Sequence, residues 1–274
     1  SLMIMESSMY KFHEIQEERP SMKEQIDRFV NTGFKRKVNV DSILELRSAF
    51  GDSVVRYNDF KLFDGPSAYF HEKTMNLLEK HQYVIDEVIK DDDFVEALYA
   101  TLAIWGLHRV GNRPNTMVSR DGFAQLLDEL KSTVVRFKDY HLAELASDLS
   151  DTSRDTVDGI AGQLWGIIEA VEIAHNKARL VAGTKLLHHL LPNLVPPMDR
   201  EYTLGFFYGN SNLNGRESEK NAFRQIFRSY FVIARFHKEE IEIIRGSKAI
   251  NHMNTSFTKV LDNAIVGYQI GDDT

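Results

Sequence analysis

The sequence contains no cysteine among its 274 residues. This absence excludes disulfide bonds, thiolate zinc sites and a cysteine nucleophile, and it is typical of a chain in a reducing cytoplasm, where we expect this protein to be. Glycine (16) and proline (6) are also scarce, which disfavours a loop-rich chain. These shortages favour a fold that rests on regular helices and an apolar core.

Long apolar runs are missing too. No run reaches the roughly 18 residues needed to cross a bilayer, so we expect no membrane partner. The first apolar residues have no basic region before them and acidic residues directly after them, so we expect no signal peptide. We predict that residues 1–20 are poorly ordered and that 21–274 form the helical domain.

An excess of basic charge is also lacking, because the formal net charge is -7. A nucleic-acid binder usually carries a basic footprint, so this balance disfavours nucleic acid as a partner without excluding it. Two local strips remain as candidates. One is the segment 34–38, and the other consists of Arg224, Arg228 and Arg235, whose spacing lines one face of a helix.

Apolar residues recur with a mostly helical period, which predicts an all-α protein. The predicted helices span 21–31, 40–50, 66–90, 92–109, 120–137, 139–149, 153–175, 177–191, 199–208, 216–245 and 254–269. β-branched and aromatic residues alternate loosely over 53–63, and this pattern predicts at most one minor strand. We expect one multi-helix globular domain, with a division into two lobes as the alternative.

The stretch 180–203 reads LVAGTKLLHHLLPNLVPPMDREYT. On a helical wheel the leucines gather on one side, whereas Lys185, His188 and His189 fall on the other. The ordinary interpretation is a surface helix with a solvated polar face. The functional interpretation places that face in a cleft, where Lys185 would lower the pKa of His189. Gly183 lies on the leucine side, where it would permit close helix approach.

A proline-rich turn follows this helix. Three prolines between 192 and 197 stiffen the chain before Asp199, which precedes an apolar helix and has the chemistry of an N-cap. Capping alone would explain this aspartate. The functional alternative is that the turn holds Asp199, Arg200 and Tyr202 at a cleft. We therefore treat Arg200, Tyr202 and His189 as candidate ligand-binding residues.

Two further polar groups border apolar helices. His108 and Arg109 end the apolar stretch that contains Trp105, and capping of the helix C-terminus is the ordinary role for such cations. The functional alternative makes both of them candidate ligand-binding residues. We expect Trp105 to be a core residue. Near the C-terminus, Asp262 and Asn263 lie opposite an apolar stripe. Both residue types are unfavourable inside a helix, which favours a specific hydrogen-bonding role for them.

Known site motifs are missing. There is no phosphate-binding loop, dinucleotide fingerprint, nucleophile elbow or metalloprotease motif. Among ten histidines only His188 and His189 are close in sequence, and adjacent helical residues diverge by about 100°. The acidic run 91–93 fits a helix start capped by Asp92 or Asp93. We expect no metal and no cofactor.

Three stretches resemble an uncharacterised prokaryotic protein family. They read TLAIWGLHR, AGTKLLHHLLPNLVPPMDR and TSFTKVLDNAIVGY, and the resemblance extends from about Leu98 onward. It implies a shared fold and supplies no activity. A narrower segment of about 20 residues, Gly183-Thr184-Lys185 followed by VPPMD, is similar to helix-hairpin-helix DNA glycosylases. That resemblance implies an amine nucleophile at Lys185 and an activating carboxylate at Asp199.

These residues leave three functional hypotheses open. The first is a non-enzymatic helical binding or interaction protein with a polar pocket near 185–202, which would draw on His189, Asp199, Arg200, Asp262 and Asn263. The second is a glycosylase-like enzyme that uses Lys185 and Asp199. The third is a structural role in a homo-oligomer through the exposed faces of the helix at 216–245. The partner and any enzymatic activity are left undecided.

Overall fold

The computed structural model describes residues 20–60, 64–107, 117–175, 179–247 and 253–271. Within these ranges the chain is helical, with one isolated antiparallel bridge between Met117 and Ala174. The α-helices are α1 Met22–Asn31, α2 Val40–Asp59, α3 Pro66–Lys80, α4 Ile85–Val88, α5 Asp92–Ile104, α6 Arg120–Val134, α7 Asp151–Ala170, α8 Leu180–Leu190, α9 Tyr202–Tyr208, α10 Arg216–Gly246 and α11 Phe257–Gly271. The predicted all-α class is confirmed, and no helix in these ranges is both long and apolar enough to cross a bilayer.

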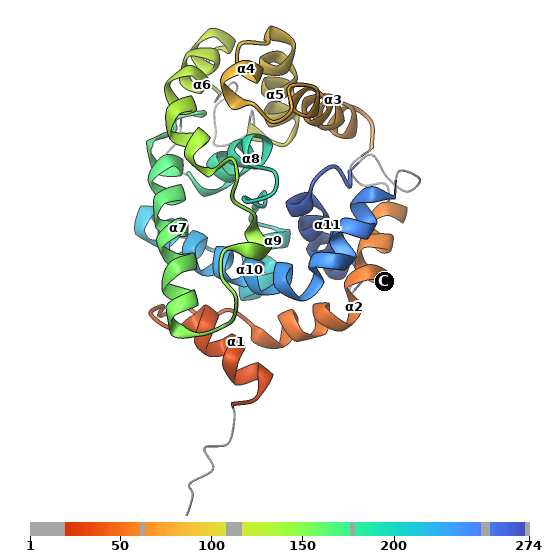
Figure 1. Cartoon of the computed structure of the whole chain (residues 1–274), viewed down its shortest axis with the longest axis vertical. Coiled ribbons are helices and arrows are strands. Elements are labelled where there is room, and N and C mark those ends of the chain that lie inside the picture. Colours follow the sequence, from red (N-terminus) through yellow and green to blue (C-terminus); the bar gives the residue numbers. More distant parts are fainter. Residues whose placement is uncertain (1–19, 61–63, 108–116, 176–178, 248–252, 272–274) are drawn as a thin grey trace, which may run out of the picture.

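The helices surround α8. In Figure 1, α3, α4, α5 and α6 lie together at one end of the molecule, whereas α1, α2 and α10 lie toward the other end, with α8 between these groups. The helix α7 runs along one side, and α11 packs along α2 on the opposite side. One apolar cluster includes buried residues from α1 through α11, so the same core supports both groups of helices.

The longest helix, α10, supplies much of this core. Its side chains Phe223, Phe227, Tyr230 and Phe231 are fully buried, as its apolar periodicity requires. Rings of this size each remove a large apolar area from water. The helix is interrupted at His237, whose backbone leaves the helical region and whose Nδ1 lies 2.8 Å from a carboxylate oxygen of Glu240.

The helix α8 is buried except at Val181 and Lys185, which are partly exposed, and this corrects the expectation of a solvated polar face. His188 and His189 are 0% exposed, and Thr184 is equally buried. The leucine side packs on α7, and Gly183 makes the predicted close approach there. A Cβ atom at Gly183 would lie 2.6 Å from a methyl carbon of Ile168.

Three predicted elements differ from the structure. The minor strand over 53–63 is wrong for residues 53–59, because α2 continues to Asp59. The predicted helix 139–149 contains only a 3-10 turn at Leu142–Glu144. The predicted helix 66–90 is divided into α3 and α4 by Gln82 and Tyr83, which both have positive φ.

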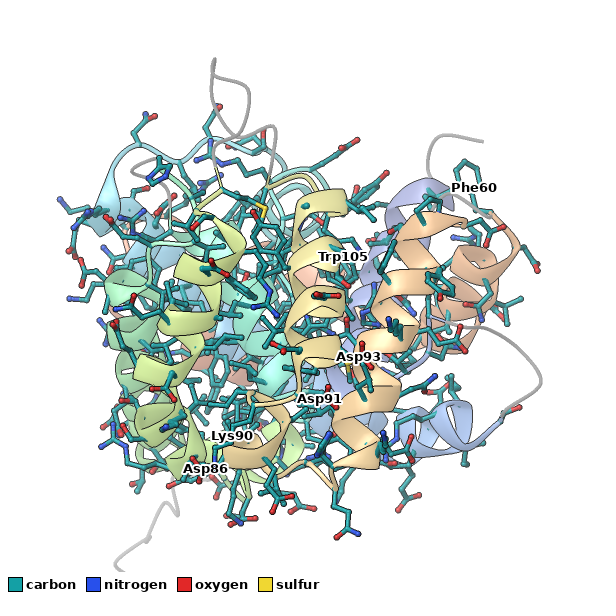
Figure 2. All side chains as sticks on the ribbon, turned by 90° about the horizontal axis from the view of Figure 1, so that it is seen from above. Phe60, Asp86, Lys90, Asp91, Asp93 and Trp105 are labelled. Carbon is teal, nitrogen blue, oxygen red and sulfur yellow. The ribbon has the colours of Figure 1, made fainter. Side chains whose placement is uncertain are left out.

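The helix α5 begins at residue 92 as predicted, but its cap lies one residue before the predicted Asp92 or Asp93. Asp91 is the N-cap, and its carboxylate accepts a hydrogen bond from the backbone N–H of Asp93 at 2.9 Å. Figure 2 shows Asp91 and Asp93 at one end of this helix and Trp105 at the other. Capping therefore accounts for the run. The predicted N-terminal segment 1–20 lies outside the described residues except for Pro20.

Candidate ligand-binding site

A cavity of about 470 Å³ lies where the end of α5 meets α3, α8, α11 and the proline-rich turn. We call it the Lys185 cavity. Its lining residues are Ser67, Ile104, Trp105, Gly106, Lys185, Pro197, Met198, Asp199, Glu201, Met253, Lys259, Asp262 and Val266. Residues from all three of the stretches quoted above for their family resemblance therefore meet at one concavity. It has the size and the mixed lining of a small-molecule pocket.

Lys185 is held in place by the end of α5. Its Nζ donates a hydrogen bond to the backbone carbonyl of Trp105 at 2.7 Å. Burial lowers the pKa of Lys185, and the nearby carboxylates of Asp199 and Asp262 offset part of this effect. A buried amine with a lowered pKa is neutral more often than an exposed lysine. It can therefore act as a nucleophile as well as a hydrogen-bond donor.

Lys259 and Asp262 form a buried ion pair one turn apart on α11. The Nζ of Lys259 lies 2.6 Å from a carboxylate oxygen of Asp262 and 2.8 Å from the side-chain oxygen of Asn263. Burial is the largest single effect and opposes the charged form of Lys259, but the attraction and hydrogen bonds of Asp262 and Tyr57 together outweigh it, so the pKa of Lys259 is raised. Burial raises the pKa of Asp262, and Lys259 offsets part of that shift. Lys259 thus remains an ammonium group at the cavity wall.

Asn263 orders the chain that precedes α11. Its amide nitrogen donates to the backbone carbonyl of Met253 at 3.0 Å and to the side-chain oxygen of Asn254 at 2.8 Å. The side chain is 0% exposed and does not line the cavity. The hydrogen-bonding role expected from an unfavourable helix residue is therefore observed. The hydrogen-bond partners of Asn263 are groups of the protein and not a ligand.

Asp199 both caps α9 and lines the cavity. Its Oδ1 accepts hydrogen bonds from the backbone N–H groups of Tyr202 at 2.7 Å and Thr203 at 3.3 Å. The expected capping chemistry is observed, but the N-cap position of α9 is Glu201, two residues later, and the Glu201 side chain makes no capping hydrogen bond. The same carboxylate is part of the lining of the Lys185 cavity. The two interpretations are therefore compatible, since one oxygen satisfies the helix start and the residue still borders the cavity.

The other candidate residues lie elsewhere. His189 is fully buried, and Arg200 lies outside the lining with its guanidinium 3.7 Å from Glu219. Tyr202 packs beside the small apolar cluster of Tyr57, Ala68, Met253, Val266 and Ile270 and is not part of the lining. His108 and Arg109 lie outside the described residues. Of the candidates, the cavity brings together Lys185, Asp199 and Asp262.

Trp105 was expected in the core and instead forms part of the cavity wall. It is half-buried, and its indole Nε1 donates to Ser67 Oγ at 3.1 Å. The ammonium groups of Lys185 and Lys259 lie 5.8 Å and 5.6 Å from its ring centroid. Sequence reasoning missed Trp105, Ser67 and Lys259. The position of Trp105 at the last turn of an apolar helix, beside Gly106, was the available signal.

Most arginines of the two expected basic strips are bonded to other groups of the protein. Arg224 and Arg228 both pair with Asp158, and Arg228 is 5% exposed. Arg235 donates to the backbone carbonyl of Ala146 at 3.0 Å. In the segment 34–38, Arg36 donates to backbone and side-chain oxygens in the loop after α9. Neither strip presents a row of free cations in the described part of the chain.

Comparison with known proteins adds no relative. No family model, curated protein or solved structure matches this chain. The two resemblances noted in the sequence find no support in these comparisons. The geometry of the Lys185 cavity is therefore the basis for the functional argument.

Proposed function

We propose that the chain binds a small, planar, hydrogen-bonding molecule in the Lys185 cavity. The observation that carries this proposal is the meeting of Lys185, Asp199 and Asp262 with Trp105 at one concavity. These residues come from separate segments of the chain, so the apolar core alone does not require them to meet. Ligand sites commonly combine an aromatic wall with a few convergent polar groups in this way.

The charges at the cavity favour a neutral ligand. Two lysines and three acidic residues, the third being Glu201, line the space, so positive and negative groups nearly balance. A polyanion would meet three carboxylates as well as the two ammonium groups. A heterocycle of nucleobase size would stack on Trp105, accept hydrogen bonds from Lys185 and donate to Asp199. Free nucleobases and nucleosides are therefore the first probes.

The test is a binding titration of wild type and variants against a panel of free nucleobases and nucleosides by calorimetry. We expect at least one probe to bind, with affinity reduced on the order of tenfold or more in Asp199→Asn and Lys185→Met. Asparagine is a good N-cap, so Asp199→Asn removes the charge and keeps α9 capped. Arg200→Ala is the control outside the cavity. Absence of binding across the panel, or equal binding in both cavity variants, would contradict the proposal.

A second candidate is covalent chemistry at Lys185, favoured by its lowered pKa and by Asp199 in the same cavity. The Nζ of Lys185 would attack the carbonyl carbon of an aldehyde, and loss of water would form an imine. This is the step that a glycosylase-like reaction would use at an abasic sugar. Borohydride would then reduce the C=N bond to a stable secondary amine.

The covalent candidate predicts a borohydride-dependent adduct with an oligonucleotide that carries an abasic site. Peptide mass spectrometry should place the adduct on Lys185 and leave Lys259 unmodified, because Asp262 keeps Lys259 protonated. Lys185→Met should abolish the adduct. Salt-dependent anisotropy with the same oligonucleotide measures whether the acidic chain binds it at all. An unmodified Lys185 would exclude this chemistry.

A further inference from the structure

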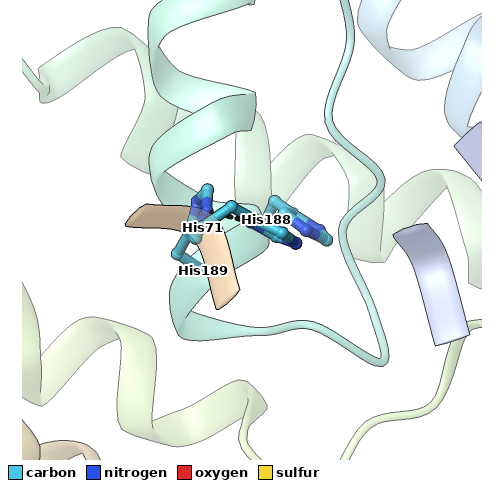
Figure 3. A group of neighbouring side chains, drawn as sticks. All are labelled: His71, His188 and His189. Carbon is cyan, nitrogen blue, oxygen red and sulfur yellow. Dashed lines mark hydrogen bonds between the residues drawn. The ribbon is translucent and has the colours of Figure 1, made fainter. Parts of the chain in front are cut away.

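Three buried histidines lie behind the wall of the Lys185 cavity. His71 comes from α3, and His188 and His189 are adjacent residues of α8 (Figure 3). One ring nitrogen of each lies within 4.8 Å of the others, and all three side chains are 0% exposed. Trp105 stacks on His71 with ring centroids 5.0 Å apart, which places the cluster next to the cavity.

The outer nitrogens of the two α8 histidines are bonded to oxygen atoms. His189 Nδ1 lies 2.7 Å from the backbone carbonyl of Lys185. His188 Nδ1 lies 3.0 Å from Thr258 Oγ1 and 3.2 Å from the backbone carbonyl of Val195. A carbonyl oxygen only accepts hydrogen bonds, so both Nδ1 atoms carry their protons. Both Nε2 atoms therefore carry a lone pair.

The Nε2 atom of His188 is the second observation that points to a ligand. It is buried, and it has no hydrogen-bond partner among the described residues. Buried polar atoms nearly always have a partner, so an orphaned lone pair requires an explanation. One ring nitrogen of His188 lies within 4.8 Å of one ring nitrogen each of His71 and His189, and Nε2 is the His188 nitrogen without a partner in the described chain.

His71 completes the set by a change of tautomer. Its Nδ1 lies 2.9 Å from His189 Nε2, which has a lone pair, so Nδ1 is the donor in this structure. Its Nε2 lies 2.7 Å from Thr255 Oγ1, which can accept as well as donate. If the proton of His71 moves from Nδ1 to Nε2, Thr255 Oγ1 accepts a hydrogen bond from Nε2–H and Nδ1 gains a free lone pair. Each histidine then donates outward to an oxygen, as metal-ligating histidines generally do.

We propose that His71 Nδ1, His188 Nε2 and His189 Nε2 bind a divalent transition metal ion of the zinc class. Three neutral imidazoles suit Zn²⁺ and its neighbours Co²⁺ and Ni²⁺, and they exclude the oxygen-preferring Mg²⁺ and Ca²⁺. Tetrahedral ligands at about 2.0–2.1 Å stand about 3.3 Å apart, so the 2.9 Å pair must open slightly, and a pair at the 4.8 Å limit of the group must close by about 1.5 Å. A fourth position remains for water or another ligand.

The surrounding charges set the strength of this site. Burial keeps the pKa of His71 and His188 well below 6.5 and that of His189 at about 4, so the three rings are neutral at pH 7 and need not lose a proton to bind. Lys259 and Lys185 also lower the pKa of His189, so they oppose a cation there. The Lys259 ammonium group is itself paired with the carboxylate of Asp262 at 2.6 Å.

The site would join α3 to α8, and His71 and His189 on these helices are 118 positions apart in the sequence. Because Trp105 rests against His71 and His189, an ion there would also brace the aromatic wall of the Lys185 cavity. The proposal does not depend on which ligand the cavity accepts. It predicts that the protein binds the metal ion in the absence of any cavity ligand.

The test is titration of the chelator-treated full chain with Zn²⁺ and Co²⁺ at neutral pH. We expect one ion per chain, a higher melting temperature with Zn²⁺, and the visible absorption of tetrahedral Co²⁺ coordinated by nitrogen. His188→Gln should bind on the order of tenfold or more weakly. The control is His81→Gln, because His81 pairs with Asp91 away from the cluster. Binding that is equal in His188→Gln, or absent from wild type, would overturn the proposal.

A second measurement covers the case in which His188→Gln fails to fold. X-ray absorption of the Co²⁺-loaded wild type counts the ligands directly and needs no variant. Three imidazole nitrogens support the site. A shell of oxygen atoms, or an ion lost on a single buffer exchange, means that the histidines are only a core cluster and the proposal is wrong.

Discussion

Replacing Lys259 with methionine is expected to lower the free energy of unfolding by about 3 to 5 kcal/mol at pH 7. Methionine has a similar length, so the main change is the loss of the positive charge beside Asp262. The Lys259 and Asp262 side chains are 5% and 9% exposed, so water can replace the missing partner only in part. An unpaired carboxylate in such a place is far more costly than a broken surface ion pair.

The pH dependence of this loss follows from Asp262. Burial already raises the pKa of Asp262 in wild type, and removal of Lys259 raises it further. A carboxyl group whose pKa is raised on folding destabilises the protein as the pH rises through that value. The deficit of Lys259→Met should therefore shrink as the pH is lowered from 7 toward 4. Urea unfolding of both proteins over this range measures it.

The matched control replaces both partners. In Lys259→Met with Asp262→Leu no buried charge is left unpaired, so much of the lost stability should return. A double variant as unstable as Lys259→Met alone would mean that apolar packing, not charge, explains the loss. A single variant that unfolds at the same urea concentration as wild type would contradict the importance of the pair.

Gly267→Ala is expected to destabilise the chain by about 3 kcal/mol or more, because α2 and α11 touch at this glycine. A Cβ atom at position 267 would lie 1.9 Å from the backbone carbonyl oxygen of Ser53 and 3.0 Å from the backbone nitrogen of Tyr57. Backbone atoms cannot turn aside as a flexible side chain can. The two helices would have to separate, which would loosen the wall that carries Lys259 and Asp262.

Gly162→Ala provides the comparison within the same chain. Gly162 is exposed on α7, and a Cβ atom there would meet no heavy atom within 4 Å. Alanine is the better helix former, so this variant should gain about 0.5–1 kcal/mol. Thermal and urea unfolding of the two variants separate the steric cost at α11 from helix propensity. Equal effects of both substitutions would contradict the proposed close contact.

Local patterns were enough to predict the class of the fold and several contacts. The 3.6-residue period placed most helices, and Gly183 was correctly expected at a close helix contact. Asp199 was recognised as a cap, and the unfavourable Asp262 and Asn263 as hydrogen-bonding groups. Each of these features depends on residues within a few positions, or on which side of one helix a residue lies.

The predictions that were wrong depend on which distant helix packs on a segment. Residues 53–59 alternate as a strand would, yet Gly267 lets α11 pack directly on them as a helix. A helical wheel identifies the polar side of α8, but it cannot show that α3 covers that side. The histidine cluster was missed for the same reason. The third ring, that of His71, comes from a distant helix.

The sequence by itself determined an all-helical chain, its main helix boundaries and the residue types available for chemistry, because helix period and capping are local properties. Only the tertiary structure decided that Lys185, Asp199, Lys259 and Asp262 border one cavity and that three histidines meet behind it. Such meetings depend on the packing of helices distant in sequence, and the apolar pattern of each helix is compatible with more than one arrangement of its neighbours.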